Sequence, residues 1–172
     1  MTYENIKMIG NKETERFLLE ISGHNSLIII GANPSTANEE KSDRTVMMAM
    51  KIADKYGYDG LVFLNLYPQR TKDPNELHAE SNKSLHERNL EVIKSMIEKT
   101  NNPKVLLAYG DLVLFRPYLK KNLHEIANLF PATTSWFKMG ELTVIGNPRH
   151  LSRLSHSTPM TDASDYISKF LK

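Results

Sequence analysis

Four short runs of apolar residues stand out along the chain, separated by longer segments of mixed character. Continuous apolar runs of this kind are typical of strands that are buried on both faces of a sheet. Three of the runs close on a glycine, which permits a sharp turn out of the strand. The runs predict strands at residues 26–31, 61–66, 105–110 and 142–146, the last paired in a hairpin with residues 133–137.

The segments between these runs carry apolar residues at intervals of three and four positions, the spacing of an amphipathic helix. Ser42 and Asp43 are suitable N-caps for the first helix. Pro117 is expected to bend or restart the third helix, because proline lacks the backbone N–H that a helix interior needs. The predicted helices cover residues 46–53, 85–97, 112–129 and 163–171, the last one capped by Asp162.

This alternation of strands and helices predicts an α/β fold. Strands joined by helices of this length form right-handed crossovers and a parallel sheet that is covered on both faces. We therefore expect a single domain over residues 1–172, a three-layer α/β/α sandwich around a mainly parallel sheet of about four strands. Residues 1–25 are expected to form an N-terminal strand and helix extension packed on this domain.

Composition supports a globular interior and excludes several kinds of chemistry. Of the 172 residues, 40% are hydrophobic and 24% are charged, which is typical of a globular domain rather than of a disordered chain. The chain has no cysteine, so disulfides and thiolate metal sites are excluded. The histidines lack the spacing of metal ligands and the common phosphate-binding glycine motifs are absent, so we expect no metal and no cofactor.

Charge and hydropathy place few limits on the partners. The polar N-terminus and the lack of an apolar run of membrane length predict a cytoplasmic protein without membrane contact. The formal net charge of +2 is compatible with nucleic-acid binding but does not require it. There is one local bias, because Arg149, His150, Arg153 and His156 fall within eight residues that contain no acid.

The loops that follow the predicted strands are the candidate site, because ligands of open parallel sheets bind at the carboxyl ends of the strands. After the first strand, Gly31 permits a tight exit. Asn33, Pro34 and Ser35 then offer polar side chains and free backbone N–H groups to a polar or anionic ligand. Taken alone, the same loop is more often a strand-to-helix turn stabilised by asparagine and proline.

Polar residues also follow the second and third strands. Asn65 interrupts an apolar strand, and its amide carries both a donor and an acceptor, which suits the edge of a nucleobase. A structural hydrogen bond is an equally good explanation of a buried asparagine. Arg70 is either a phosphate ligand or a solvated loop charge. Tyr109 is a candidate stacking platform, and Asp111 is expected to cap the next helix.

The loop after the fourth predicted strand is the most basic part of the chain. Arg149 and Arg153 offer contacts to phosphate, and His150 offers a proton or a hydrogen bond. Leu151 is expected to be an exposed apolar tip. A solvated basic loop is the alternative, but the convergence of four polar loops on one sheet edge favours a site.

Seven short motifs occur in order along the chain: Asn33-Pro-Ser-Thr-Ala37, Asp43-Arg-Thr45, Asn65-Leu66, Arg70-Thr71 with Pro74, Asn89, Ala108-Tyr-Gly110 and Pro148-Arg-His150. Together they resemble the motifs of a family of bacterial and phage proteins of unknown function, DUF1643. The resemblance extends over about residues 27–155 and implies no settled activity. Two positions depart from the family pattern, with Leu151 in place of proline and Tyr109 in place of tryptophan.

A more distant resemblance concerns the uracil-DNA glycosylase superfamily, which has a parallel sheet between helices. Gly31-Ala-Asn-Pro34 and Asn147-Pro-Arg-His-Leu-Ser152 are similar in sequence and position to the motifs that follow the first and last strands of its mismatch-specific branch. The resemblance implies that Asn33 positions an attacking water and that Asn65 holds the base.

The same resemblance implies roles for the last loop. Asn147 would steady the leaving base, and Leu151 would fill the gap left by a flipped base. His150 is the remaining candidate for a catalytic group. Arg149 and His150 stand where small residues are usual, and the aspartate of the most active branch has no counterpart.

The expected function is therefore a pocket for a nucleobase or nucleotide, with DNA glycosylase-like hydrolysis of an N-glycosidic bond as the leading reaction. Two alternatives stay open: a non-catalytic protein that binds nucleotides or nucleic acid, and an interaction module in a phage or defence context. The expected partner is a nucleobase, a nucleotide or DNA, and the sequence indicates no oligomeric state. We expect Asn33, Asn65, Arg70, Arg149 and His150 to line one pocket.

Overall fold

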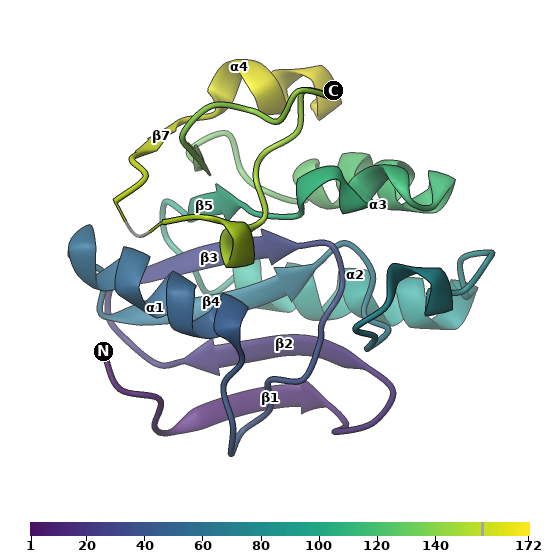
Figure 1. The fold of residues 1–172 in the computed structure, drawn as a ribbon, viewed down its shortest axis with the longest axis horizontal. Coiled ribbons are helices and arrows are strands. Elements are labelled where there is room, and N and C mark those ends of the chain that lie inside the picture. Colours follow the sequence, from purple (N-terminus) through teal and green to yellow (C-terminus); the bar gives the residue numbers. More distant parts are fainter. Residues whose placement is uncertain (156) are drawn as a thin grey trace.

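The computed structural model describes residues 1–155 and 157–172, so His156 of the basic segment lies outside the described residues. Its centre is a seven-stranded sheet with the order β1-β2-β4-β3-β5-β6-β7 (Figure 1). The strands are β1 Ile6–Gly10, β2 Arg16–Ile21, β3 Ser26–Gly31, β4 Gly60–Asn65, β5 Lys104–Leu107, β6 Ser135–Met139 and β7 Met160–Asp162.

The sheet is mixed. Strands β4, β3, β5 and β6 run parallel to one another, whereas β1 with β2, β2 with β4, and β6 with β7 are antiparallel. The α/β class is thus confirmed, but the sheet has seven strands in mixed order rather than about four in mainly parallel order. Two of the additional strands come from the N-terminal 25 residues, where β1 and β2 pair within the sheet itself.

Three of the predicted strands lie close to their expected positions, and the fourth is wrong. Residues 142–146 contain a turn, in which the Gly146 N–H donates to the Thr143 carbonyl at 2.8 Å. Val144 and Ile145 are exposed at 105% and 65%, so this apolar run is not a buried strand. Instead β6 lies beside β5 and β7, and it does not form the expected hairpin.

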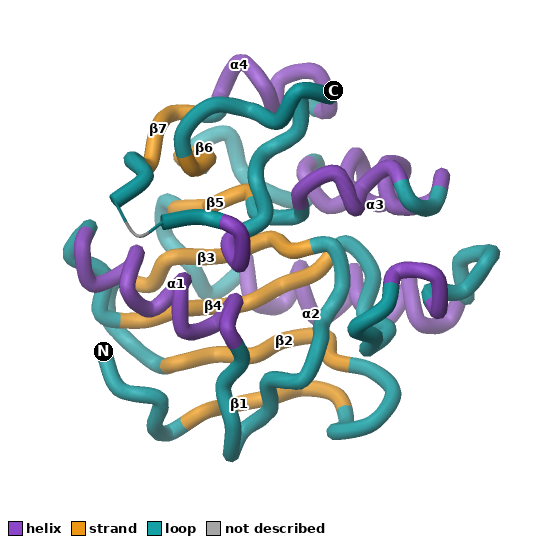
Figure 2. Tube along the Cα trace, in the orientation of Figure 1, coloured by secondary structure: helices purple, strands orange, loops and turns teal. Residues whose placement is uncertain are grey.

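The helices cover both faces of the sheet. Figures 1 and 2 show α1 (Arg44–Lys55) in front of the strands and α2 (Lys83–Ile97) behind them. Helices α3 (Pro117–Ala127) and α4 (Ser164–Ile167) pack into the same hydrophobic core as α2. Alternate strand residues point to opposite cores, so in β3 Leu27 and Ile29 face α1 while Ile28 and Ile30 face α2.

Local signals explain most of the helix boundaries. Asp43 is the N-cap of α1, as predicted, and its side chain accepts from the Val46 N–H. The expected helix at 112–129 is a 3₁₀ turn, Gly110–Leu114, followed by α3, which begins at Pro117. The last helix is only four residues long, and its N-cap is Ala163 rather than Asp162. Among the described helices, none combines the length and the apolar character that spanning a bilayer requires.

Candidate functional site

A cleft of about 800 Å³ opens at the carboxyl ends of β3, β4 and β5, on the face of the sheet that α1 covers. Its floor is apolar and includes Ile29, Phe63 and Ala108. The loops after the strands, the start of α1 and residues 143–154 form its walls. This volume is within the range of small-molecule sites.

The loop after β3 lines the cleft through Asn33 and Ser35, while Pro34 is buried beneath it. The Asn33 amide nitrogen donates to the Thr71 carbonyl at 3.0 Å and to the Pro34 carbonyl at 3.1 Å. The bond to Thr71 ties the loop after β3 to the loop after β4. The Asn33 side chain therefore has a structural role in joining two walls of the cleft.

Gly31 lies at the end of β3, and its φ is outside the left-handed region. The backbone turn after β3 therefore does not need a glycine at this position, contrary to expectation. A Cβ at this position would lie 3.0 Å from Asn65 Oδ1. Gly31 is opposite Asn65 in the parallel pairing of β3 and β4. The glycine therefore makes room for the Asn65 amide.

Asn65 ends β4 and is only 2% exposed. Its backbone carbonyl accepts from the Asn89 side chain at 2.9 Å, but its own side-chain nitrogen is buried without a hydrogen-bond partner. Leaving a buried donor unpaired costs about 1–3 kcal/mol. Because Asn65 lines the cleft beside Ile29 and Phe63, this donor is available to a ligand atom that accepts a hydrogen bond.

The basic segment supplies three residues to the opposite wall: Arg149, His150 and Arg153. The two arginines are exposed, and Arg149 Nε donates to the Glu141 carbonyl at 2.8 Å. His150 Nδ1 accepts from the Ser152 N–H at 3.3 Å, and this bond favours the neutral tautomer with its hydrogen on Nε2. Burial lowers the pKa of His150, the Arg153 charge lowers it further, and Asp43 opposes them. His150 is thus a neutral donor at neutral pH.

Arg70 does not line the cleft, contrary to expectation. Its Nε donates to the Asn11 carbonyl at 2.8 Å, and its Nη1 donates to the carbonyls of Ser35 and Ala37 at 2.8 and 2.9 Å. A guanidinium has five N–H donors in a fixed fork, which suits it to such backbone clamping. Arg70 therefore holds the wall that Asn33 and Ser35 belong to.

Three further expected site residues belong to the interior. Tyr109 is 0% exposed and donates to the Tyr166 hydroxyl at 3.0 Å, so it is not an open stacking platform. Leu151 is also 0% exposed and packs in the core beneath α1, so it is not an exposed tip. Asn147 is 7% exposed, and its amide nitrogen donates to Asp111 Oδ1 at 2.8 Å. None of these three lines the cleft.

Two carboxylates that the sequence did not single out as site groups line the cleft. Asp43 caps α1 and also accepts from the Ala37 N–H at 3.3 Å. Asp111 does not cap the next helix as expected, because it accepts instead from the Thr143 hydroxyl at 2.7 Å and from Asn147. These hydrogen bonds lower the pKa of Asp111. Asp43 belongs to a motif noted in the sequence, but only its capping role was apparent there.

Arg16, at the start of β2, is the third unexpected residue of the site. It is 3% exposed, its Nη1 donates to the Ala37 carbonyl at 3.0 Å, and its Nε is buried without a partner. Burial lowers the pKa of Arg16 to about 10, and the neighbouring Arg70 lowers it as well. No sequence signal marked this residue, because β2 was not among the predicted strands.

The side chains that could bind a metal ion are scattered in the part of the chain that the structure describes. No group of three or more His, Asp or Glu side chains is placed there to hold a metal ion. The cleft instead combines cationic groups, two carboxylates and unpaired amide and guanidinium N–H donors above an apolar floor. Such a lining suits an organic ligand that carries acceptor atoms and negative charge.

Comparison with known proteins identifies a family but no characterised relative. No curated protein and no solved structure matches this chain. A family model described as "Protein of unknown function (DUF1643)" matches residues 16–150. This match begins at Arg16, ends at His150 and includes nearly every residue that lines the cleft, all but Ser152, Arg153 and Leu154. The chain therefore belongs to the DUF1643 family of proteins of unknown function.

Proposed function

We propose that the cleft binds a nucleotide, with the base held against the apolar floor and read by Asn65. The observation that carries the proposal is the buried, unpaired Asn65 amide nitrogen beside Ile29 and Phe63. Flat apolar contacts bind the faces of a base, and a fixed amide binds one of its edges. Without a ligand this donor has no partner within the described chain, so an acceptor atom on the ligand removes the cost of burying it.

The cationic rim supports the charged half of the proposal. Lys72, Arg149 and Arg153 line the cleft from exposed positions, where they can contact phosphate without first being desolvated. The neutral His150 adds a hydrogen-bond donor. Nucleotide binding thus uses both the apolar floor and the charged edge of one cleft.

Isothermal titration calorimetry with a panel of nucleoside monophosphates and short single-stranded DNA tests this proposal. Asn65→Ala is expected to weaken binding by about 1–3 kcal/mol, or roughly 5- to 150-fold in Kd. Asn25→Ala is a matched control, because this exposed side chain donates to the Gly57 carbonyl at the amino end of the sheet. Binding of no panel member by the wild type, or equal affinities for wild type and Asn65→Ala, would contradict the proposal.

A second candidate is hydrolysis of an N-glycosidic bond, as the likeness of Gly31-Ala-Asn-Pro34 to glycosylase motifs suggests. Asparagine cannot act as a general base, but the Asp43 carboxylate also lines the cleft and is able to orient a water. Neutral His150 would donate a hydrogen bond to the leaving base. Asn147 has no direct part in this version, because its amide is bound to Asp111.

The hydrolysis assay uses DNA that carries uracil, mismatched thymine or modified bases, followed by alkaline cleavage at abasic sites. Asp43→Asn is the informative variant, because asparagine also caps helices well and so preserves α1 while removing the carboxylate. Abasic-site formation that is lost in Asp43→Asn supports this candidate. Absence of abasic sites on every substrate removes it and leaves nucleotide binding as the function.

A further inference from the structure

Arg16 is a buried cation with few partners. It is 3% exposed, and the one hydrogen bond of its side chain in the described chain runs from Nη1 to the Ala37 carbonyl at 3.0 Å. No ion pair of Arg16 with a described carboxylate lies within 4.0 Å. Its Nε has no partner and the residue lines the cleft. Burying an uncompensated charge costs several kcal/mol, so such an arginine is unfavourable for folding alone.

Two guanidinium groups lie close together at this end of the cleft. Arg70 donates to the same Ala37 carbonyl at 2.9 Å, which brings a second guanidinium close to the first. The Asp43 carboxylate is nearby and raises the pKa of Arg16, and its oxygens also accept from the backbone N–H groups of Val46 and Ala37. Even with its lowered pKa, Arg16 stays protonated at neutral pH. The unpaired Nε of Arg16 is therefore the donor that a further negative group can satisfy.

The start of α1 lies at the same end of the cleft. Thr45 and Val46, in the first turn of this 12-residue helix, line the cleft together with Arg16. The N-terminus of a helix carries a partial positive charge and free N–H groups, which attract anions. The unpaired Arg16 Nε is independent evidence for a ligand at this helix end.

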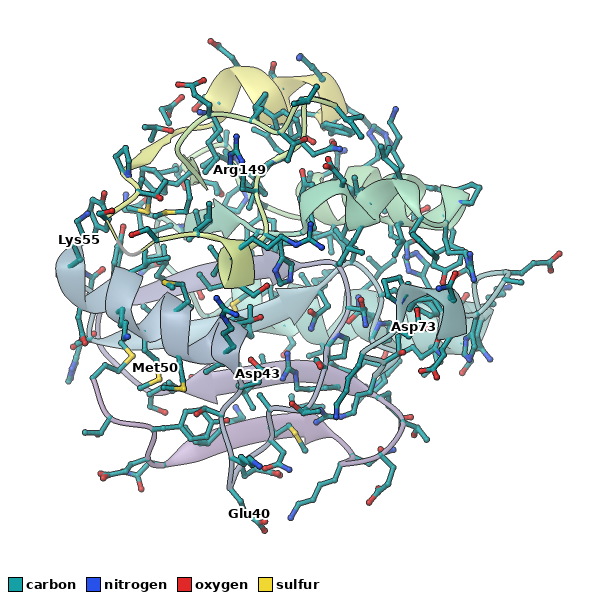
Figure 3. The ribbon with its side chains drawn as sticks, in the orientation of Figure 1. Glu40, Asp43, Met50, Lys55, Asp73 and Arg149 are labelled. Carbon is teal, nitrogen blue, oxygen red and sulfur yellow. The ribbon has the colours of Figure 1, made fainter. Side chains whose placement is uncertain are left out.

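We propose that the β2 end of the cleft is an oxyanion subsite, in which Arg16 and the start of α1 bind the phosphoryl or carboxylate oxygens of a ligand. This subsite is separate from the basic rim. Arg16 lies on β2, whereas Arg149 donates to residues just after β6, and strands β4, β3 and β5 lie between them. Figure 3 shows Arg149 well above Asp43, the residue that caps α1. The subsite does not depend on the ligand being a nucleotide.

The subsite is tested with inorganic phosphate and with acetate, each against sodium chloride of equal ionic strength. Phosphate at about ten times its Kd is expected to raise the Tm of the wild type by roughly 3–5 °C. A rise in Tm with acetate but not with phosphate would identify a carboxylate site. Arg16→Met is expected to lose this shift while keeping or raising the Tm measured without anion, because methionine removes the buried charge at similar length. Arg88→Met, which removes an exposed arginine on α2, is expected to keep the shift.

Two results would overturn the subsite: no specific Tm shift of the wild type with either anion, or an equal shift in Arg16→Met. A second measurement covers the case in which Arg16→Met does not fold. In the wild type, phosphate is expected to move one arginine Nε–H resonance that shows contacts to Ala37, and an unchanged spectrum counts against the subsite. An anion response without any nucleotide binding would support the subsite while contradicting the proposed function, so the two ideas fail separately.

Discussion

Gly31→Ala is predicted to impair ligand binding while leaving the fold intact. The φ of Gly31 is one that alanine also adopts, so the backbone is not strained by the change. The new Cβ would lie 3.0 Å from Asn65 Oδ1, and its next neighbour, the Leu64 carbonyl, would be 3.9 Å away. The Asn65 amide is therefore the group that has to move.

The size of the effect follows from this geometry. Ordinary contacts of a Cβ begin at 3.4 Å, so the amide is displaced by about 0.4 Å, the difference between 3.4 and 3.0 Å. Replacing glycine by alanine stabilises a protein by about 0.4–1 kcal/mol, because it lowers the conformational entropy of the unfolded chain. The close contact with the Asn65 amide offsets this gain, so the Tm is expected to change by no more than about 4 °C. Binding loses up to the full Asn65 hydrogen bond, about 1–3 kcal/mol or roughly 5- to 150-fold in Kd.

A double-mutant cycle separates this explanation from a general distortion of the cleft. Thermal unfolding and nucleotide calorimetry are compared for wild type, Gly31→Ala, Asn65→Ala and the double variant. Because Asn65→Ala removes the atom that the new Cβ meets, adding Gly31→Ala to it is expected to cause little further loss of affinity. Equal losses from Gly31→Ala in both backgrounds, or unchanged affinity in the single variant, would refute the reasoning.

Two further predictions concern pH and charge. The pKa of His150, measured by NMR titration, is expected to lie below its ordinary value and to rise in Arg153→Gln. Because the folded pKa is lowered, the stability of the protein is expected to decrease as the pH falls from the unfolded pKa of about 6.5 through the folded pKa. A His150 titration without this shift would contradict the prediction. Asp111→Asn is expected to destabilise the protein at neutral pH by weakening the bonds of residue 111 to Thr143 and Asn147. The difference in stability from wild type is expected to shrink as the pH falls below the unfolded pKa of about 3.9 and then through the lowered folded pKa of Asp111. A difference that does not depend on pH would contradict the lowered pKa of Asp111.

Three of the buried strands were predictable because they carry continuous apolar runs. β3 occupies Ser26–Gly31 as expected, and β4 and β5 lie within a few residues of their predicted places. β1 lacks such a run, since its residues alternate between partly buried and exposed. It is an edge strand, and only its pairing with β2 defines it. The mixed character of the sheet therefore depends on contacts that no local pattern encodes.

The false strand at residues 142–146 has a different cause. Apolar residues in a run normally indicate burial, but Val144 and Ile145 are exposed in a turn at the rim of the cleft. The turn is closed by bonds of its own, such as that from the Gly146 N–H to the Thr143 carbonyl, and Asp111 also holds it from outside through its bonds to Thr143 and Asn147. A carboxylate that follows β5 thus helps to fix the conformation of a segment more than 30 positions later, since the two bonds span 32 and 36 residues.

Some residues of the candidate site were likewise predictable from local sequence, whereas others depend on contacts between distant segments. The rule that ligands bind at strand carboxyl ends located Asn33 and Asn65, because each follows or ends a parallel strand. His150 also lines the cleft, although the strand at 142–146 from which it was predicted does not form. Polarity alone did not distinguish side chains that face the cleft from those, like Arg70 and Asn147, that brace its walls. That distinction depends on which backbone groups lack partners after folding.

Arg16 is the clearest case of a residue whose role appears only in three dimensions. In the sequence it precedes an apolar segment and reads as an ordinary charge at the start of a strand. In the fold, the antiparallel pairing of β2 with β4 brings its end of β2 to the edge where Asn65 ends β4. Of the buried side-chain atoms without a partner in the described structure, the two that belong to residues lining the cleft are Arg16 Nε and Asn65 Nδ2, and both are N–H donors. A ligand that satisfies both must therefore present hydrogen-bond acceptors at two neighbouring strand ends, which favours a polar, negatively charged molecule over an apolar one.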